Sequence, residues 1–292
     1  MHRGLGGTGV VGTLRHGDGP AIGLRADMDA LPIRETTGLP YASKIDGKMH
    51  ACGHDGHTAT LLAAARYLAA HKSFRGTLHV IFQPAEEGMG GAREMIKDGL
   101  FRLFPCDAVF ALHNMPGHPT GKFGFLPGPF MASSDTVTIR VTGRGGHGAV
   151  PHRAVDPVVA CASMVMALQS VVSRNVNPLD MAIVTVGAIE AGEVHYDRRY
   201  PVLVNDPATT ELAREVAREW LGEGGLIGDM VPLTGSEDFS FMLEECPGCY
   251  LIVGNGDGEG GCMVHNPGYD FNDECLPLAA TYWVRLVERY LR

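Results

Sequence analysis

The sequence predicts an α/β protein in which a mainly parallel sheet is covered by helices and interrupted by a smaller inserted α+β domain. Apolar strand patterns alternate with helix patterns at both ends of the chain, an order typical of parallel sheets. Between these ends the pattern changes to a half-exposed strand followed by one long amphipathic helix. We therefore predict a discontinuous main domain, residues 1–132 and 200–292, and an inserted domain, residues 133–199.

Each predicted element follows from a local pattern. Strands are short apolar runs beside turn residues, and helices are longer segments whose apolar side chains recur at helical spacing. The first glycines precede a strand instead of following one, which excludes a dinucleotide-binding turn. The predicted strands are Val10–Leu14, Ala21–Leu24, Thr77–Phe82, Ala108–Leu112, Thr136–Thr142, Ala182–Ile189 and Cys249–Val253. The predicted helices are Thr58–Ala70, Ala92–Asp98, Asp156–Ser173, Ala208–Leu221 and Leu276–Leu291.

The bulk composition is that of a folded protein with a sizeable core. The chain has 292 residues, of which 45% are hydrophobic, and its mean hydropathy is near zero. Its net charge is −9 and its basic residues are scattered, which argues against a nucleic-acid partner. We expect no membrane span, because no apolar run approaches ~20 residues, and no signal peptide. Seven irregularly spaced cysteines indicate reduced thiols in a cytoplasmic protein.

The densest group of chemically active residues is the segment Met49–His57, which contains one cysteine, three histidines and an aspartate. Cys52 and His54 are the strongest candidates for metal ligands, because thiolate and imidazole suit transition metals. The segment enters a predicted helix, whose free N–H groups favour an anion such as a thiolate. In the alternative interpretation, Cys52 is a small buried apolar residue and the histidines are caps or surface residues.

Three further segments place ligand-type residues after apolar strands or in loops. They are Gln83–Gly88, with a glutamate pair, Ala111–Pro116, with a histidine, and His265–Asp273 near the C-terminus. Sites in open α/β sheets are built at such strand ends. These segments favour a metal site over the structural interpretation of Cys52.

Seven motifs together give the chain a family resemblance. It resembles the M20 metallopeptidase and amidohydrolase family, and within it the aminoacylase and hippurate hydrolase branch, which includes plant hydrolases of auxin–amino acid conjugates. Each motif alone is weak, whereas seven in family order are specific. In order along nearly the whole chain, they are LRADMDALPI, ACGHDGH, PAEEG, LHNMP, GRGGHGAVPH, GSEDF and HNPGYDFND.

The resemblance implies a dinuclear metal site. Five ligands from four separated segments exceed what one tetrahedral ion with a bound water needs, which also indicates two divalent ions. The mixed nitrogen, sulfur and oxygen donors favour zinc or manganese, with nickel or cobalt as alternatives. The candidate ligands are Cys52, His54, Glu87, His113 and His265.

The resemblance also implies two catalytic residues. Glu86, the first of the glutamate pair, would be the general base that takes a proton from the attacking water and passes it to the leaving amine. Alternatively, the pair only caps the next helix. His147 would stabilise the oxyanion of the tetrahedral intermediate, in its own subunit or in a partner's site.

Other polar residues have two interpretations each. Where many relatives have H-x-D, this chain has D-x-D, so Asp29 either orients a ligand imidazole or caps a turn. Asn114 and Tyr269 are expected to support the ligands. The segment Gly235–Phe239 resembles a substrate-side loop, but capping of the following helix is the favoured interpretation.

These features predict a metal-dependent amidohydrolase that cleaves N-acyl amino acids. The alternatives are a dipeptidase or carboxypeptidase of the same family, a non-catalytic metal-binding homologue, and a structural zinc protein. The inserted domain corresponds to the family's lid or dimerisation domain, so a homodimer or tetramer is expected. Residues 191–193 run directly into the segment Val194–Pro201, whereas relatives carry more lid there, so we expect a shortened lid; the alternative is that further residues lie between these two segments.

Overall fold

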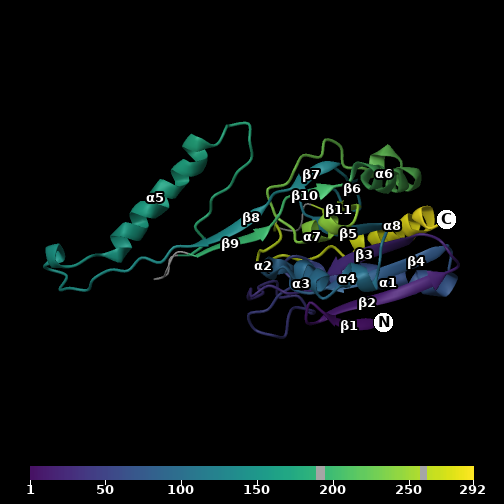
Figure 1. Cartoon of the computed structure of the whole chain (residues 1–292), viewed down its shortest axis with the longest axis horizontal. Helices are drawn as coiled ribbons and strands as arrows, with labels where there is room; N and C mark the ends of the chain where they lie inside the picture. The colour runs from purple at the N-terminus through teal and green to yellow at the C-terminus, as the bar shows by residue number, and fades with distance from the viewer. Residues whose placement is uncertain (189–194, 257–261) are drawn as a thin grey trace. The chain divides into compact units, whose positions relative to one another are not determined.

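The computed structural model describes residues 1–188, 195–256 and 262–292 (Figure 1). Contacts divide the chain into two compact units, and each is described by itself. Unit 1 comprises residues 1–133 and 200–292, and unit 2 comprises residues 134–199.

Unit 1 is built on a seven-stranded sheet with the strand order β1-β2-β4-β3-β5-β11-β6. The four inner strands β4, β3, β5 and β11 pair in parallel, whereas the pairings at both margins are antiparallel. The predicted mainly parallel α/β fold is therefore confirmed. The strands are β1 (His2–Leu5), β2 (Gly9–His16), β3 (Ala21–Asp27), β4 (Gly76–Gln83), β5 (Ala108–Met115), β6 (Phe123–Gly124) and β11 (Gly248–Gly254).

Helices cover both faces of this sheet (Figure 1), which is why the inner strands read as nearly continuous apolar runs. On one face, α1, α6 and α8 pack against the sheet. On the other face, α3, α4 and α7 do so. The helices of unit 1 are α1 (His54–His71), α2 (Glu86–Met89), α3 (Gly91–Lys97), α4 (Leu100–Leu103), α6 (Pro207–Leu221), α7 (Phe239–Glu245) and α8 (Cys275–Tyr290).

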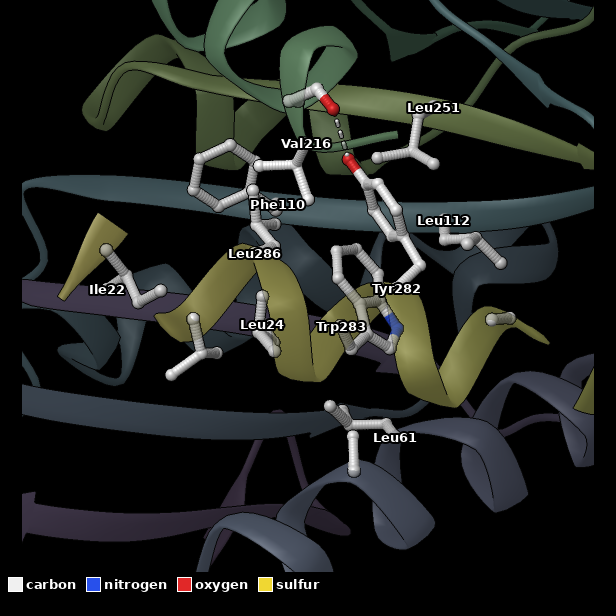
Figure 2. Packing of buried hydrophobic residues seen from close by; sticks show 14 of the residues in the cluster. Ile22, Leu24, Leu61, Phe110, Leu112, Val216, Leu251, Tyr282, Trp283 and Leu286 are labelled. Atoms are coloured by element: carbon white, nitrogen blue, oxygen red, sulfur yellow. Dashed lines mark hydrogen bonds between the residues drawn. The ribbon is translucent and has the colours of Figure 1, made fainter. Parts of the chain in front are cut away.

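The larger core lies under α8. Figure 2 shows Tyr282 and Trp283 of this helix among side chains of β3, β5 and α1, and both rings are almost completely buried. The Tyr282 hydroxyl donates a hydrogen bond of 2.9 Å to the carbonyl of Ala213 in α6. Truncating a buried ring such as Trp283 to alanine typically costs about 3–5 kcal/mol. This packing fixes the scaffold on which the polar strand ends are displayed.

The sequence did not indicate several short elements. The first strand, β1, was not predicted and pairs antiparallel with β2, and a short glycine-rich segment connects the two. A separate two-stranded antiparallel sheet in unit 1 consists of β7 and β10. These elements are short, and their apolar patterns are correspondingly weak. Their bounds are β7 (Gly128–Met131), β10 (Leu203–Asn205) and the 3₁₀ turn η2 (Glu223–Gly225).

Unit 2 contains a two-stranded sheet of β8 (Ser134–Thr138) and β9 (His195–Tyr200), whose last residue belongs to unit 1. It also contains the 3₁₀ turn η1 (Pro151–Arg153) and the predicted amphipathic helix, α5 (Pro157–Asn175). The strand predicted over 182–189 is wrong for its described residues 182–188, which form no strand. Ile189 and the proposed shortening at 191–193 lie outside the described residues.

Helix α5 differs from one sequence expectation. It is long and apolar enough to cross a membrane by length and composition alone, although we expected no such run. Core helices of soluble proteins pass the same test, but α5 buries none of its residues in the structure.

Candidate metal centre and active site

The segment before α1 presents Cys52 and His54 at the edge of the sheet. Gly53 between them has a left-handed φ of 85°, and a Cβ there would lie 2.5 Å from Asn114 Oδ1. Only glycine fits this backbone without displacing its neighbour. Helix α1 therefore begins at His54, which is buried together with Cys52.

The five predicted ligands lie together. Cys52 Sγ lies 3.3 Å from His113 Nε2, and His265 Nε2 lies 3.1 Å from Glu87 Oε1. Glu87 Oε1 is also 4.0 Å from His54 Nε2. Two groups of three ligand atoms can each hold an ion and share the thiol: Cys52, His54 and His113 form one, and Cys52, Glu87 and His265 form the other. This arrangement offers donors for two ions side by side.

The chemistry of these donors fits a bound cation. Both ring nitrogens of His54 and Oε1 of Glu87 are buried without a hydrogen-bond partner, which costs free energy unless something binds them. Burial and the nearby carboxylates raise the pKa of the Cys52 thiol well above its ordinary value, so its thiolate requires a cation. Burial lowers the pKa of His113, and its Nδ1 donates to the Asn114 carbonyl at 2.6 Å, leaving Nε2 free as a ligand.

Asp29 supports the ligands, as one of its two interpretations proposed. Its Oδ1 lies 3.4 Å from His54 Nδ1, and its Oδ2 accepts a 3.0 Å hydrogen bond from the backbone N–H of Glu87. Burial opposes protonation of His54, but Asp27, Asp29 and Glu87 together raise its pKa to about 9. With Asp29 beside Nδ1, the remaining nitrogen Nε2 is the one available to an ion.

His57 and Asp27 form a second layer below the ligands. Asp27 Oδ1 is 2.6 Å from His57 Nδ1, and His57 Nε2 is 2.6 Å from Asn114 Oδ1. Asn114 Nδ2 donates to the Tyr269 hydroxyl at 2.5 Å. Burial acts to raise the pKa of Asp27, but Arg25 and the histidines hold it well below its ordinary value. This chain of hydrogen bonds connects β3, α1 and β5 with the C-terminal loop.

A fully buried arginine connects this layer to the segment before α7. Arg25 Nη1 donates to Asp27 Oδ2 at 2.6 Å, and Nε donates to Gln83 Oε1 at 2.8 Å. Nη2 donates to Glu237 Oε1 at 3.0 Å and to Asp238 Oδ1 at 3.2 Å. Each guanidinium nitrogen therefore has a partner, so the charge is compensated by hydrogen-bonded carboxylates.

The segment Gly235–Phe239 corrects an expectation. Glu237 Oε1 does accept a 3.0 Å hydrogen bond from the backbone N–H of Phe239, as a helix cap would. Asp238, in contrast, makes no cap for α7 and accepts instead from the backbone N–H of Ala92 at 2.8 Å. The favoured interpretation as a simple cap is therefore wrong for Asp238, because the charge of Arg25 holds its carboxylate in the interior.

Glu86 lies beside the ligands His54 and Glu87, and its side chain is buried. It shares a cluster of carboxylates with Glu237 and Asp238, whose oxygens lie within 4.8 Å of one another. Burial and these neighbours, with Glu87, raise the pKa of Glu86 well above its ordinary value. Burial and Glu237 likewise raise the pKa of Asp238 to about 8, against the effect of Arg25. Carboxylates with pKa values shifted in this way are typical of functional sites.

His147 belongs to unit 2 and is exposed, and its Nδ1 accepts a 3.1 Å hydrogen bond from the backbone N–H of Ala149. The predicted role of His147, stabilisation of the oxyanion, would involve a unit 2 residue at a unit 1 site, and the two units are described separately. This role therefore stays a prediction. Several buried polar residues of the site had no role predicted from the sequence. One signal was present: charged residues, Asp27 among them, alternate with apolar ones at the end of the buried strand β3. The residues without a predicted role are Arg25, Asp27, His57, Gln83 and Tyr200.

The comparisons with known proteins agree with this geometry. The sequence matches Peptidase family M20/M25/M40 over residues 23–289. A hippurate hydrolase of Campylobacter jejuni is 42% identical over 335 aligned positions, which cover 99% of this chain and 86% of that protein. That alignment is longer than the 292 residues of this chain, so the relative carries residues with no counterpart here.

A plant protein and a protein of known crystal structure are also similar to this chain. IAA-amino acid hydrolase ILR1-like 2 of Arabidopsis thaliana is 35% identical over 98% of this chain and 76% of its own length. The crystal structure of Bacillus subtilis YXEP protein, a dinuclear metal binding peptidase from the M20 family, is 30% identical with a TM-score of 0.75 and covers 97% of this chain and 85% of that one. The resemblance drawn from the seven motifs is confirmed. The chain belongs to the M20 peptidase family.

Proposed function

We propose that this chain is a metal-dependent amidohydrolase that cleaves the amide bond of N-acyl amino acids, releasing a carboxylic acid and a free amino acid. The observation that carries the proposal is the convergence of five ligand-type side chains beside one buried glutamate, Glu86. The 42% identity to a hippurate hydrolase supports the substrate class, because hippurate is an N-acyl amino acid.

Two divalent ions are the cofactors that best suit this donor set. Bound there, they would polarise the scissile carbonyl and lower the pKa of a water molecule, which is the usual contribution of paired hydrolytic metals. The mixture of one thiol, three imidazoles and one carboxylate favours zinc or manganese, with nickel or cobalt as alternatives. The ligands that we propose are Cys52, His54, Glu87, His113 and His265.

Glu86 is the proposed general base. The attacking water loses a proton to the Glu86 carboxylate as its oxygen bonds to the amide carbon. When the carbon–nitrogen bond breaks, Glu86 returns that proton to the leaving nitrogen, so the residue ends the cycle unchanged. Its neighbour Glu87 faces His265, which leaves Glu86 as the member of the pair that is free to move protons.

We further propose that His147 donates a hydrogen bond to the substrate carbonyl oxygen as this oxygen becomes negatively charged. This role needs the inserted unit over the site, in the same subunit or in a partner of a homodimer or tetramer. A cytoplasmic location fits the seven cysteines, which are free thiols.

The test is a hydrolysis screen coupled to metal analysis. We expect turnover of benzoyl-, acetyl- or indoleacetyl-amino acids well above that of dipeptides, with about two metal ions per chain and loss of both metal and activity after chelation. Preferential turnover of dipeptides would replace the proposal by a peptidase function. Bound metal without turnover of any acyl-amino acid would instead indicate a non-catalytic homologue.

A further inference from the structure

Tyr200 connects the point where the chain returns to unit 1 with the backbone of the proposed base. It is the last residue of β9 and the first residue of the second segment of unit 1. Its side chain is buried, and its ring packs edge-on against the ring of Phe241 in α7, with 6.2 Å between the ring centroids. Its hydroxyl donates a short hydrogen bond to the carbonyl of Glu86 and accepts one of 3.3 Å from the N–H of Gly90.

The segment that carries Glu86 is irregular, so it needs such support. Ala85 adopts a left-handed φ of 58°, which costs a non-glycine residue about 1 kcal/mol or more. Glu87, at ψ 79°, and Gly88, at φ 78°, also depart from helical geometry. Side chains hold this segment at two places: Asp29 binds the N–H of Glu87, and the Tyr200 hydroxyl binds the carbonyl of Glu86.

The Tyr200 hydroxyl can donate this hydrogen bond over the whole neutral pH range. Burial and the nearby carboxylates of Asp238 and Glu86 raise the pKa of Tyr200 well above its ordinary value. The group therefore keeps its proton and always has one to donate to the carbonyl. Because the ring is fixed against Phe241, the hydroxyl can define where the Glu86 backbone lies.

We propose that Tyr200 is a positioning residue for catalysis: its hydroxyl holds the Glu86 backbone so that the Glu86 carboxylate is correctly placed beside the five ligands. Within the described residues, the Tyr200 hydroxyl makes its hydrogen bonds to the backbone of Glu86 and Gly90 and not to a ligand side chain, so it acts through Glu86 and not through the metal centre. The inference rests on the proposed function, in which Glu86 moves the protons. Tyr200 is also the residue at which the chain returns from unit 2 to unit 1, so a residue at this junction holds the segment that carries the base.

The test compares Tyr200→Phe with a matched control, Tyr282→Phe. Both variants remove a buried tyrosine hydroxyl that donates to a backbone carbonyl, but Tyr282 binds Ala213 in the core under α8 (Figure 2). Both should lower the melting temperature by a similar amount, about 2–4 °C. Only Tyr200→Phe should lower kcat, by about tenfold or more, with KM and metal content unchanged, because a small displacement of a reacting group is costly.

A double variant separates this inference from the proposed function. If Tyr200 acts through the Glu86 carboxylate, Tyr200→Phe should cause no further loss of kcat in a Glu86→Gln background. Equal kcat values for Tyr200→Phe and Tyr282→Phe would overturn the inference, as would loss of metal in Tyr200→Phe or an additive loss in the double variant. Full activity of Glu86→Gln alone would instead overturn the mechanism in the proposed function.

Discussion

Helices α5 and α6 begin in the same way but differ completely in burial. Each follows an aspartate and starts with proline, and each aspartate, Asp156 or Asp206, accepts a 2.8 Å hydrogen bond from a backbone N–H of the first turn. Helix α6 buries five of its residues, whereas α5 buries none. Local sequence therefore fixes where both helices start, and tertiary packing decides how much each contributes to stability.

The same contrast holds for the two units. Unit 1 buries whole ionic groups, such as Arg25 with Asp27, and satisfies them with hydrogen bonds. In unit 2, none of the residues whose burial is described is buried. The proposed base, Glu86, and the ligands Cys52, His54 and His113 are likewise buried in unit 1, while unit 2 offers exposed groups, including His147. Four predictions test this difference, from the largest expected effect to the smallest.

The largest effect is expected for the glutamate pair in unit 1. Glu86→Gln keeps the shape of the side chain but removes its basicity, so kcat should fall by about 10²–10⁴-fold while both metals stay bound. Glu87→Gln should instead lose metal, because Glu87 is a proposed ligand. Kinetics and metal analysis of both variants check this assignment. The reverse metal contents would exchange the two roles, and full activity of both variants would reduce the pair to a helix cap.

The second prediction concerns the buried charge of Arg25. Arg25→Met leaves the carboxylates of Asp27, Glu237 and Asp238 without their cation, so the free energy of unfolding should fall by about 3–5 kcal/mol. Arg34→Met is the matched control, because the ion pair of Arg34 with Asp46 is 81% exposed on both sides. The control should change stability by less than about 0.5 kcal/mol. Denaturant unfolding measures the free energy of unfolding of both variants. Similar losses in the two would show that the buried network adds nothing to stability.

The third prediction moves to unit 2. His147→Ala should lower kcat by about 10²–10³-fold if this imidazole stabilises the oxyanion. Metal content and melting temperature should stay unchanged, because the side chain is exposed. His152→Ala, also exposed in unit 2, is the control and should retain activity. Normal turnover of His147→Ala would remove the residue from the mechanism.

A mixing experiment extends this third test. If the site is shared between subunits, combining His147→Ala with Glu86→Gln should restore part of the activity through hybrid oligomers. Each hybrid would contain one site with both an intact base and an intact histidine. An absence of recovery despite demonstrated subunit exchange would mean that His147 acts within its own chain or not at all.

The sequence predicted those parts of the fold and site that depend on local patterns. The inner strands and the long helices carry clear periodicity, and Cys52, His54 and His113 lie in short motifs at strand or helix ends. The partners of Arg25 could not be predicted in this way, because Glu237 and Asp238 follow more than 200 positions later. A buried ion pair has no periodicity, so only the folded chain reveals it.

Two errors have the same physical origin. The strand predicted over 182–189 has apolar residues such as Ile183, but they remain exposed in the structure, and no neighbouring strand pairs with residues 182–188. Strand propensity depends on pairing and packing against a neighbour more than on the residues themselves. The role of Tyr200 was missed for a related reason, since a tyrosine at a strand end gives no sign of which carbonyl it binds.

The smallest effect on the isolated chain is expected for the exposed side of α5. Val159 and Met166 are 63% and 73% exposed and lie seven positions apart, so they project from the same side of the helix. Val159→Asp and Met166→Asp should therefore change the stability of the monomer by less than about 0.5 kcal/mol. An apolar helix without buried residues is typical of an interaction surface.

If unit 2 forms the proposed subunit contact through this side, the same substitutions should shift the protein from dimer or tetramer to monomer, because a buried unpaired carboxylate disfavours association. Sedimentation or light scattering over a concentration series measures this shift. Leu212→Asp in α6 is the opposite case: it should unfold unit 1, since Leu212 packs against the core under α8. An unchanged oligomeric state in both α5 variants would mean that this side makes no subunit contact. The difference between α5 and α6 would then reflect the sequence of unit 2 alone and not a missing partner.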